Sequence, residues 1–227
     1  MLKVVCNAWH ATKVAFANEV SRIAPAYHVD PVELFRLFVL DHKLNLSAAY
    51  LRPGMPFGGA CLTKDVSALS QMAQQKNIVA QGIASVLPSN EAHLDYITQR
   101  ILTHPKQHGT VVLVGLGFKP GVTDLRESPS VELTQKIQAS GLSVSIVDNH
   151  LVKWPELEGI TRLHSVSEAF ALGHLLLAAH PGPQDARELL TLDSAYVLDI
   201  GGELSKLKQR SSVATGPRIE ARTRVTD

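Results

Sequence analysis

Cys61 is the residue of this sequence whose surroundings best suit covalent chemistry. It follows the pair Gly58-Gly59, where the backbone can come close to a ligand, and it precedes residues 62–75, which have the spacing of a helix. The positive N-terminal end of that helix favours a thiolate. Lys64 and Asp65 lie three and four residues further on, on the same helical face. We therefore interpret Cys61 as a candidate nucleophile, with a buried free cysteine beside a tight turn as the alternative.

A polar stripe near the start of the chain gives a second candidate site. Lys3, Asn7, His10, Val14 and Asn18 follow one another in steps of three or four residues, so they share one face of a helix. Asn and His do not favour a helix interior, so their presence there needs a reason such as contact with a ligand. A solvated helix face is the alternative explanation.

Several motifs in a fixed order resemble those of one enzyme family. They are Lys3-Val-Val-Cys-Asn7, Trp9-His10-Ala11, Phe16-Ala17-Asn18-Glu19, Asp41–Ser47, Arg52-Pro53-Gly54, Gly58–Asp65, Gly115–Gly121 and Asp124–Pro129. On these residues the sequence is similar to the UDP-glucose/GDP-mannose dehydrogenase family, strongly over about residues 3–150 and in general pattern over 150–203. Thr63 stands where the family usually has proline before Lys64, and Ala49 stands where a tyrosine is usual.

The resemblance implies an NAD-dependent, four-electron oxidation of a nucleotide sugar at C6, from alcohol to aldehyde to acid. GDP-mannose is the expected substrate, with UDP-glucose left open. By resemblance Cys61 attacks the aldehyde, Asp65 activates the water that releases the acid, and Lys3 and Asn7 contact the substrate oxygen. Lys64 and Arg126 are the implied NAD-binding residues. The implied contacts to the sugar nucleotide are His10, Asn18, Tyr50, Arg52, Phe57, Gly59 and Lys119.

The family also begins with a dinucleotide-binding domain, which this sequence does not show. Its one Gly-x-Gly, at Gly115 and Gly117, lies in a later segment and lacks the full fingerprint. We therefore expect the central and C-terminal parts of such a dehydrogenase, a homodimer through the central helices, and a separate N-terminal NAD-binding chain as a candidate partner. Two alternatives stay open. One is a non-catalytic sugar-nucleotide-binding or dimerisation remnant, and the other is a different thiol enzyme such as an acyl transferase.

The composition is that of an ordinary globular protein. With 45% hydrophobic residues and a formal net charge of +1, the 227-residue chain can bury one or two cores and has no electrostatic drive toward nucleic acid or membrane. Two cysteines do not make a disulfide framework, and no apolar run approaches about 18 residues, so we expect a cytoplasmic location. His93 and the remaining histidines lack paired metal-ligand spacing, so we predict no metal and interpret them as surface or packing residues.

The hydrophobic pattern changes near residues 88–90. We predict a central helical domain with the thiol site over residues 1–88, a Rossmann-like sugar-nucleotide-binding domain over 89–204 and a disordered tail over 205–227. Helices are predicted at 3–24, 31–40, 62–76 and 89–103. Beyond them, short apolar strands at 110–115, 143–148, 175–179 and 196–200 alternate with helices at 130–140, 165–172 and 184–190. This alternation predicts a parallel sheet and the α/β fold class.

Ligands of such sheets bind beyond the carboxyl ends of the strands. The strand predicted at 110–115 runs into a glycine-rich loop that contains Lys119, which is positioned to meet a sugar or phosphate oxygen. Ser128 caps the next predicted helix and offers an anion site. A plain strand-to-helix connection is the alternative.

Overall fold

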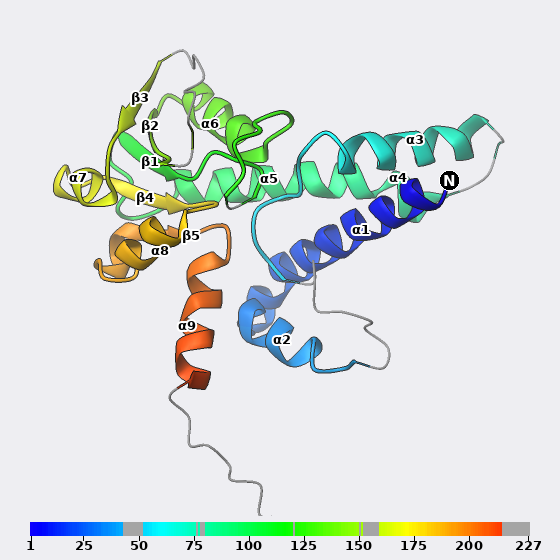
Figure 1. The fold of residues 1–227 in the computed structure, drawn as a ribbon, viewed down its shortest axis with the longest axis horizontal. Helices are drawn as coiled ribbons and strands as arrows, with labels where there is room; N and C mark the ends of the chain where they lie inside the picture. The colour runs from blue at the N-terminus through cyan, green and yellow to red at the C-terminus, as the bar shows by residue number, and fades with distance from the viewer. Residues whose placement is uncertain are drawn as a thin grey trace, which may run out of the picture.

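The structure is a computed structural model of the 227-residue chain, and it describes residues 1–42, 52–75, 77, 80–119, 121–149, 151 and 159–214. The helices are α1 (Leu2–Ile23), α2 (Pro31–Phe38), α3 (Leu62–Gln75), α4 (Gln81–Ala84), α5 (Val86–Leu102), α6 (Pro129–Ala139), α7 (Val166–Ala171), α8 (Pro183–Leu189) and α9 (Glu203–Ala214), with 3-10 turns η1 (Ala24–Tyr27) and η2 (Ser194–Tyr196). The strands are β1 (Thr110–Val114), β2 (Ser143–Val147), β3 (Ile160–Leu163), β4 (Leu175–Ala178) and β5 (Val197–Asp199). The sheet forms a body at one end, from which α1, α3 and part of α5 extend as an arm (Figure 1).

The helical arm has a small core of its own. α1 packs against α3 and α5. The small side chains of Ala8, Ala11 and Ala15 recur every three or four residues on α1, so the helices approach closely and bury Val66 of α3 and Val86 of α5. Within the described ranges, no helix is both long and apolar enough to cross a membrane.

The sheet is parallel throughout, with the strand order β3-β2-β1-β4-β5. Successive residues of β1 enter different cores. Val111 and Leu113 pack on the side of α5 and α6, whereas Val112 and Val114 pack on the side of α7 and α8. The strand order reverses between β1 and β4, so the switch point of this doubly wound sheet lies between them.

One continuous helix, α5, connects the arm to the sheet. Val86 in its first turn belongs to the arm's core, while Leu94, Ile97 and Ile101 are buried beneath the sheet. Because a single helix contributes to both cores, side chains from the arm and from the sheet can contribute to one site.

The predicted α/β fold class is confirmed, since helices lead into a parallel sheet. The predicted strands and most predicted helices lie within a few residues of the observed ones. Two elements carry too little signal to be predicted. β3 is an edge strand in which the exposed Thr161 and Arg162 interrupt the apolar pattern, and α4 is too short to show a period.

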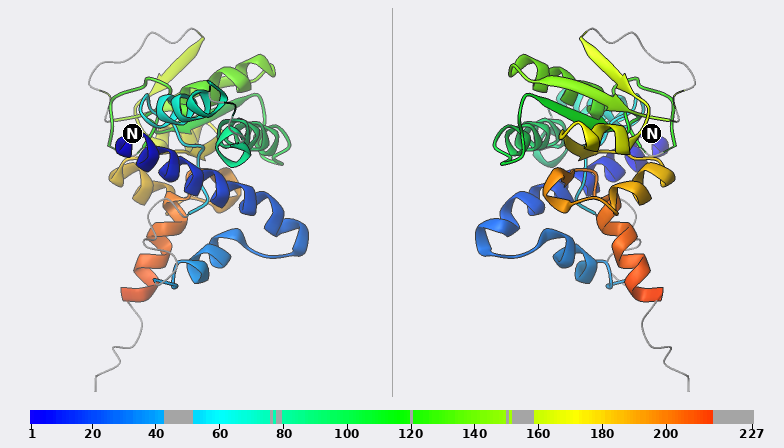
Figure 2. Two further views of the ribbon diagram at one scale, coloured as in Figure 1. Left: turned by 90° about the vertical axis from the view of Figure 1, so that its right-hand side faces the viewer. Right: turned by 90° about the vertical axis from the view of Figure 1, so that its left-hand side faces the viewer.

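The predicted disorder after Ser205 is wrong for residues 205–214, which form most of α9. The Ser205 backbone N–H and hydroxyl donate to Asp199 Oδ2 over 2.9 and 2.8 Å. Leu204 is buried and Leu207 packs against the same core, on the α7 and α8 side of the sheet. These two leucines, three residues apart, pack an otherwise polar helix against the sheet. The side views show that α9 and α2 extend away from the sheet on the same side of the molecule (Figure 2).

Candidate functional site

The thiol loop, residues 52–61, is held by hydrogen bonds from the helices around it. Asn90 of α5 pairs with the backbone of Phe57 in both directions. Its Oδ1 accepts from the Phe57 N–H and its Nδ2 donates to the Phe57 carbonyl oxygen, each over 2.9 Å. The segment leading to Cys61 is therefore fixed by tertiary contacts despite its proline and glycine content.

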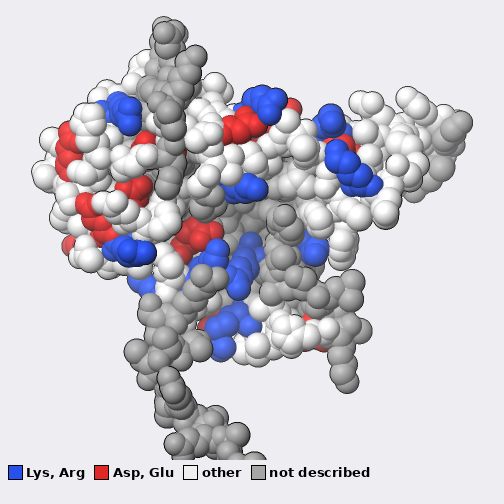
Figure 3. Space-filling view, in the orientation of Figure 1, with Lys and Arg blue, Asp and Glu red and all other residues white. Residues whose placement is uncertain are grey.

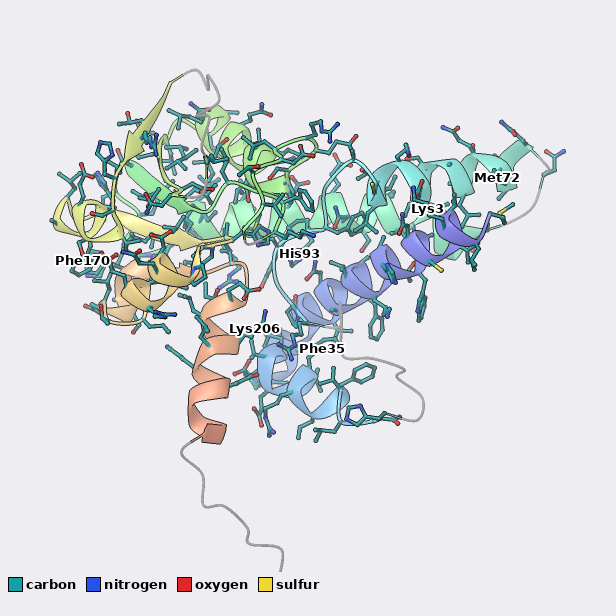
Figure 4. The ribbon with its side chains drawn as sticks, in the orientation of Figure 1. Lys3, Phe35, Met72, His93, Phe170 and Lys206 are labelled. Atoms are coloured by element: carbon teal, nitrogen blue, oxygen red, sulfur yellow. The ribbon has the colours of Figure 1, made fainter. Side chains whose placement is uncertain are left out.

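Two further side chains hold Gly54 in the same loop. His93 Nε2 donates to the Gly54 carbonyl oxygen over 2.8 Å, and the Oδ1 of Asn18 accepts from the Gly54 N–H over 3.2 Å. Figure 4 shows His93 where α5 passes the thiol loop. Because His93 comes from α5 and Asn18 from α1, the two helices fix the loop from both sides.

The double glycine brings the thiol loop against the sheet domain. Gly59 has a φ of +83°, a conformation that favours glycine, and its N–H donates to the Glu127 carbonyl oxygen over 3.0 Å. A Cβ on Gly58 would lie 2.3 Å from Cδ of Pro129. The hydroxyl of Thr63 donates to the Glu127 carboxylate. The loop is thus seated where α6 begins, and a side chain at Gly58 would prevent that approach.

Cys61 ends the thiol loop directly before α3, and its side chain is exposed. Its carbonyl oxygen accepts from the Asp65 N–H over 3.0 Å, so the thiol lies at the N-terminal end of the helix. Beside it is a hollow of about 510 Å³, which we call the thiol cavity. The predicted site residues that line it are Asn7, His10, Arg52, Phe57, Gly59, Cys61, Lys119 and Arg126.

Basic side chains from separate parts of the chain meet at the thiol cavity. Arg52 comes from the thiol loop, Lys119 from the segment after β1 and Lys206 from α9. In Figure 3 Lys and Arg side chains gather between the sheet body and the N-terminal helices. Lys206 pairs with Glu203 over 3.1 Å and lies on the side of α9 that faces α2 (Figure 4). Within the described residues neither Arg52 nor Lys119 forms an ion pair, so the cavity offers net positive charge to an anion.

Arg126 lies close to the thiol and is oriented by Asp124. Its Nη2 donates to the Asp124 carboxylate over 2.7 Å and its Nε over 3.0 Å. The hydrogen bonds from the Arg126 side chain, and then from its backbone N–H, lower the pKa of Asp124 to about 2. The same hydrogen bond raises the pKa of Arg126, and an electrostatic contribution from the nearby Cys61 raises it slightly further. Cys61 therefore has a cation nearby, the Arg126 guanidinium paired with Asp124.

Lys3, Asn7 and Asp65 form one group between α1 and α3. Asn7 Nδ2 donates to Asp65 Oδ2 over 2.5 Å, and Lys3 Nζ lies 3.7 Å from the same oxygen. The Asp65 side chain is only 4% exposed, whereas that of Lys3 is 70% exposed. The hydrogen bond from Asn7, and then the charges of Lys3 and Lys64, lower the pKa of Asp65 against the opposing effect of burial. The group therefore holds Asp65 as an ionised carboxylate.

The other predicted residues lie away from the cavity lining. Lys3 and Asp65 reach it only through Asn7, and Lys64 is exposed on α3. Asn18 is fully buried and contacts the thiol loop instead of the cavity. Tyr50 lies outside the described residues.

Four residues of the site carry no clear signal of their own in the sequence. Asn90 and His93 hold the thiol loop, and Glu127 accepts hydrogen bonds from Gly59 and Thr63. His180 follows β4 and lines the thiol cavity. Spacing of Asn90 and His93 by three residues on one helix face is the signal that could have found those two. In the part of the chain that the structure describes, no three His, Cys, Asp or Glu side chains are grouped to hold a metal.

A second hollow, of about 580 Å³, shares Pro56 and Phe57 with the thiol cavity. Its lining includes Glu91, Glu127 and Glu132 but neither the thiol nor the basic residues described above. An acidic hollow does not suit a diphosphate, so we place the candidate site in the thiol cavity.

Comparison with known proteins points to one family over both parts of the chain. Residues 1–92 match the central domain of the UDP-glucose/GDP-mannose dehydrogenase family, and residues 112–200 match its UDP binding domain. GDP-mannose 6-dehydrogenase of Azotobacter vinelandii is 47% identical over 151 residues, which are 66% of this chain and 34% of that protein.

Solved structures agree with this assignment. A ternary complex of GDP-mannose dehydrogenase from Pseudomonas aeruginosa superposes with a TM-score of 0.62 at 33% identity, covering 88% of this chain and 49% of that one. UDP-glucose dehydrogenase from Pyrobaculum islandicum gives a TM-score of 0.77 at 26% identity, with 88% and 46% covered. The chain thus spans less than half the length of each of these relatives.

The fold and the site define one class of protein, in which helices place a thiol beside a parallel, doubly wound sheet. Sheets of this type commonly bind nucleotides at their switch point. Both matched regions belong to the same family and together take in most of the sequence. The chain belongs to the UDP-glucose/GDP-mannose dehydrogenase family.

Proposed function

We propose that this chain carries the thiol-bearing and substrate-binding parts of a GDP-mannose 6-dehydrogenase, which oxidises GDP-mannose to GDP-mannuronate with NAD. The observation that best supports the proposal is the thiol cavity, where Cys61 shares one hollow with the basic residues Arg52 and Lys119. A nucleotide sugar has a diphosphate for the cations and a C6 carbon for the thiol. The two relatives named above with the higher sequence identities are GDP-mannose dehydrogenases, which supports GDP-mannose as the substrate.

Cys61 is the proposed nucleophile. Once C6 is an aldehyde, the sulfur adds to its carbon and the carbonyl oxygen takes up a proton, which gives a thiohemiacetal. Loss of a hydride and a proton from this adduct leaves a thioester. Water then attacks the thioester carbon, the uronate leaves, and the thiol is regenerated.

The group formed by Lys3, Asn7 and Asp65 supports this chemistry. Asn7 lines the cavity, so its amide is suited to contact the substrate oxygen that becomes negative in the tetrahedral steps. Lys3, which pairs with the same carboxylate as Asn7, is proposed to reach that oxygen beside it. Asp65 is one helical turn beyond Cys61 and is held ionised, which suits activation of the water. The proposed contacts to the sugar nucleotide are His10, Asn18, Tyr50, Arg52, Phe57, Gly59 and Lys119, with Asn18 acting through the thiol loop.

Lys64 and Arg126 are the residues proposed to hold NAD, which accepts hydride in both oxidation steps. Lys64 follows Cys61 by three residues, and Arg126 interacts electrostatically with it. Two cations near the thiol fit a dinucleotide, because its diphosphate is bound well by charged donors.

We also propose two protein partners. Large apolar side chains are exposed on the N-terminal helices, including Leu2 at 78%, Trp9 at 56% and Leu37 at 53%. Exposed apolar groups of this kind favour a homodimer through these helices. The second proposed partner is a separate NAD-binding chain, which would bring the dinucleotide to Arg126 at the thiol cavity.

The exposed apolar side chains and the basic cavity residues also fit one alternative function, a non-catalytic module that binds the sugar nucleotide or mediates dimerisation. Such a module keeps the basic residues of the cavity but has no need of the thiol. Reactivity at Cys61 therefore separates the two functions, whereas ligand binding tests what they have in common.

Calorimetric titration of the full chain with GDP-mannose and with UDP-glucose tests the binding. We expect GDP-mannose to bind and Lys119→Ala to weaken its affinity by about tenfold or more, because a charge-assisted hydrogen bond is lost. Lys208→Ala is the matched control, since Lys208 is exposed on α9 and does not line the cavity. The proposal would be overturned if neither nucleotide sugar binds, or if Lys119→Ala and Lys208→Ala change the affinity equally.

A further inference from the structure

His180 follows β4 at the switch point of the sheet. Its backbone N–H donates to the Val114 carbonyl oxygen over 3.3 Å, which ties it to the end of β1. At Gly115, with a φ of +88°, a Cβ would lie 2.1 Å from the His180 carbonyl oxygen. The absence of a side chain at Gly115 therefore lets the two strand ends meet. Ligands of doubly wound sheets bind at this position.

The imidazole of His180 has no hydrogen-bond partner among the residues that the structure describes. Both Nδ1 and Nε2 are shielded from solvent, and neither is paired within the described part of the chain. The residue nevertheless lines the thiol cavity, together with Lys119 and Cys61. Buried polar groups are nearly always paired, so two unpaired nitrogens at the edge of a cavity indicate a partner that enters that cavity.

The charge state of His180 limits what that partner can be. Loss of hydration lowers the pKa of the imidazole to about 4, so the ring is neutral near pH 7. A neutral imidazole has one N–H donor and one acceptor nitrogen. It complements a hydroxyl or the edge of a base, which also donate and accept, better than it complements a phosphate. The cations Arg52 and Lys119 are available for the phosphates.

We propose that His180 is a ligand-binding residue, which hydrogen-bonds a neutral polar group of the nucleotide sugar held in the thiol cavity. This inference rests on the proposed function, because it takes a nucleotide sugar as the ligand. After a small rotation of the imidazole toward the cavity, one of its ring nitrogens forms a hydrogen bond to a sugar or ribose hydroxyl or to the base.

The test compares His180→Leu with the wild-type chain. Because the imidazole is unpaired without ligand, we expect His180→Leu to leave the melting temperature of the free chain unchanged or higher. We expect the same variant to weaken GDP-mannose binding by about three- to tenfold, the value of one hydrogen bond. His180→Gln, which keeps a donor and an acceptor, should recover part of the affinity. A purely structural role predicts the reverse, with a lower melting temperature and unchanged affinity.

Titrations with GDP and with mannose 1-phosphate identify the group that His180 meets. A loss of affinity that persists with GDP points to the base or ribose, and one that persists with mannose 1-phosphate points to the sugar. If His180→Leu loses affinity for none of GDP, mannose 1-phosphate and GDP-mannose, the inference is overturned.

Lys119→Ala separates failure of this inference from failure of the proposed function. If wild type binds, Lys119→Ala binds weakly and His180→Leu stays within about twofold of wild type, only the inference on His180 is wrong. If wild type binds no nucleotide sugar, both are wrong. Should His180→Leu not fold, the ring ¹⁵N shifts of His180 in the wild-type chain decide the matter. They should change on addition of GDP-mannose, and unchanged shifts would overturn the inference.

Discussion

Asn7 and Asp65, 58 positions apart in the chain, share a hydrogen bond of 2.5 Å between Asn7 Nδ2 and Asp65 Oδ2. This bond joins α1 to α3 one helical turn after Cys61. It is also the largest cause of the lowered pKa of Asp65. One contact thus couples the packing of two helices to the charge of the carboxylate nearest to the thiol along the helix.

Acid should weaken the fold through Asp65. A carboxyl whose pKa is lowered in the folded chain contributes stability that is complete above its ordinary value of 3.8 and is lost as the pH falls through the lower folded value. We expect Asn7→Leu to show a smaller acid-dependent loss of stability than wild type, because the main cause of the lowered pKa is removed. Urea unfolding between about pH 6 and about pH 3 measures this difference.

Asp65→Asn serves as the reference for that comparison, since it has no carboxyl to titrate. Its stability should change least with pH, and Asn7→Leu should fall between it and wild type. Parallel curves for wild type and Asp65→Asn would show that Asp65 makes no such contribution.

The two cysteines should differ in reactivity although both are exposed. Cys61 lies at the N-terminal end of α3 and interacts with the Arg126 guanidinium, whereas Cys6 lies within α1. We expect iodoacetamide to label Cys61 about two- to fivefold faster than Cys6 near pH 7, the effect of a helix terminus on a nearby anion. Peptide mass spectrometry over time gives both rates. Arg126→Gln should narrow the difference, and equal rates in the wild-type chain would contradict the nucleophile assignment.

Loss of the Asn90 side chain should loosen the thiol loop. Asn90→Leu leaves the N–H and the carbonyl of Phe57 without partners, so we expect the free energy of unfolding to fall by about 1 to 3 kcal/mol. Glu91→Gln, at the next and exposed position of α5, should change it by less than about 0.5 kcal/mol. Denaturant titration of the three proteins is the measurement. Similar stabilities would mean that the two bonds to Phe57 do not hold the loop.

Two glycine substitutions should have opposite effects. An alanine Cβ at Gly58 would lie 2.3 Å from Pro129 Cδ and 2.5 Å from the Glu127 carbonyl oxygen, so Gly58→Ala should destabilise the chain by about 1 to 3 kcal/mol. Gly82 on α4 has open space around it, so Gly82→Ala should be neutral or stabilising by about 0.5 to 1 kcal/mol. Thermal unfolding compares them. If Gly58→Ala unfolds at the same temperature as wild type, the close contact between the thiol loop and the start of α6 does not stabilise the chain.

The thiol end of the site could be predicted because its signals are local. Cys61, its glycines and Lys64 lie within one short run, and helical spacing alone places Asn7 and His10 on one face. The strand that precedes Lys119 is apolar and buried, so its position at a strand end also followed from the sequence.

Other parts of the site depend on contacts between distant segments, which the sequence pattern does not encode. Asn90 meets Phe57 across 33 positions, and its role arises only from the packing of α5 against the thiol loop. His180 lies beside the end of β1 and lines the thiol cavity because β1 and β4 run side by side in the sheet. The order of α9 depends on Leu204 and Leu207 reaching a core that the composition of the segment does not reveal.

Addition of a nucleotide-sugar aldehyde to the chain tests the central claim, that Cys61 reacts at C6 of a ligand bound in the thiol cavity. The step needs no oxidant, since the thiol adds to the aldehyde carbon and the oxygen takes up the proton. The ligand is GDP-mannose whose C6 is labelled with ¹³C and oxidised to the aldehyde. NMR of this carbon distinguishes the aldehyde and its hydrate from the thiohemiacetal. We predict the thiohemiacetal signal with wild type and with Cys6→Ser, and its absence with Cys61→Ser. No such signal with wild type, or an equal signal with Cys61→Ser, would contradict the claim.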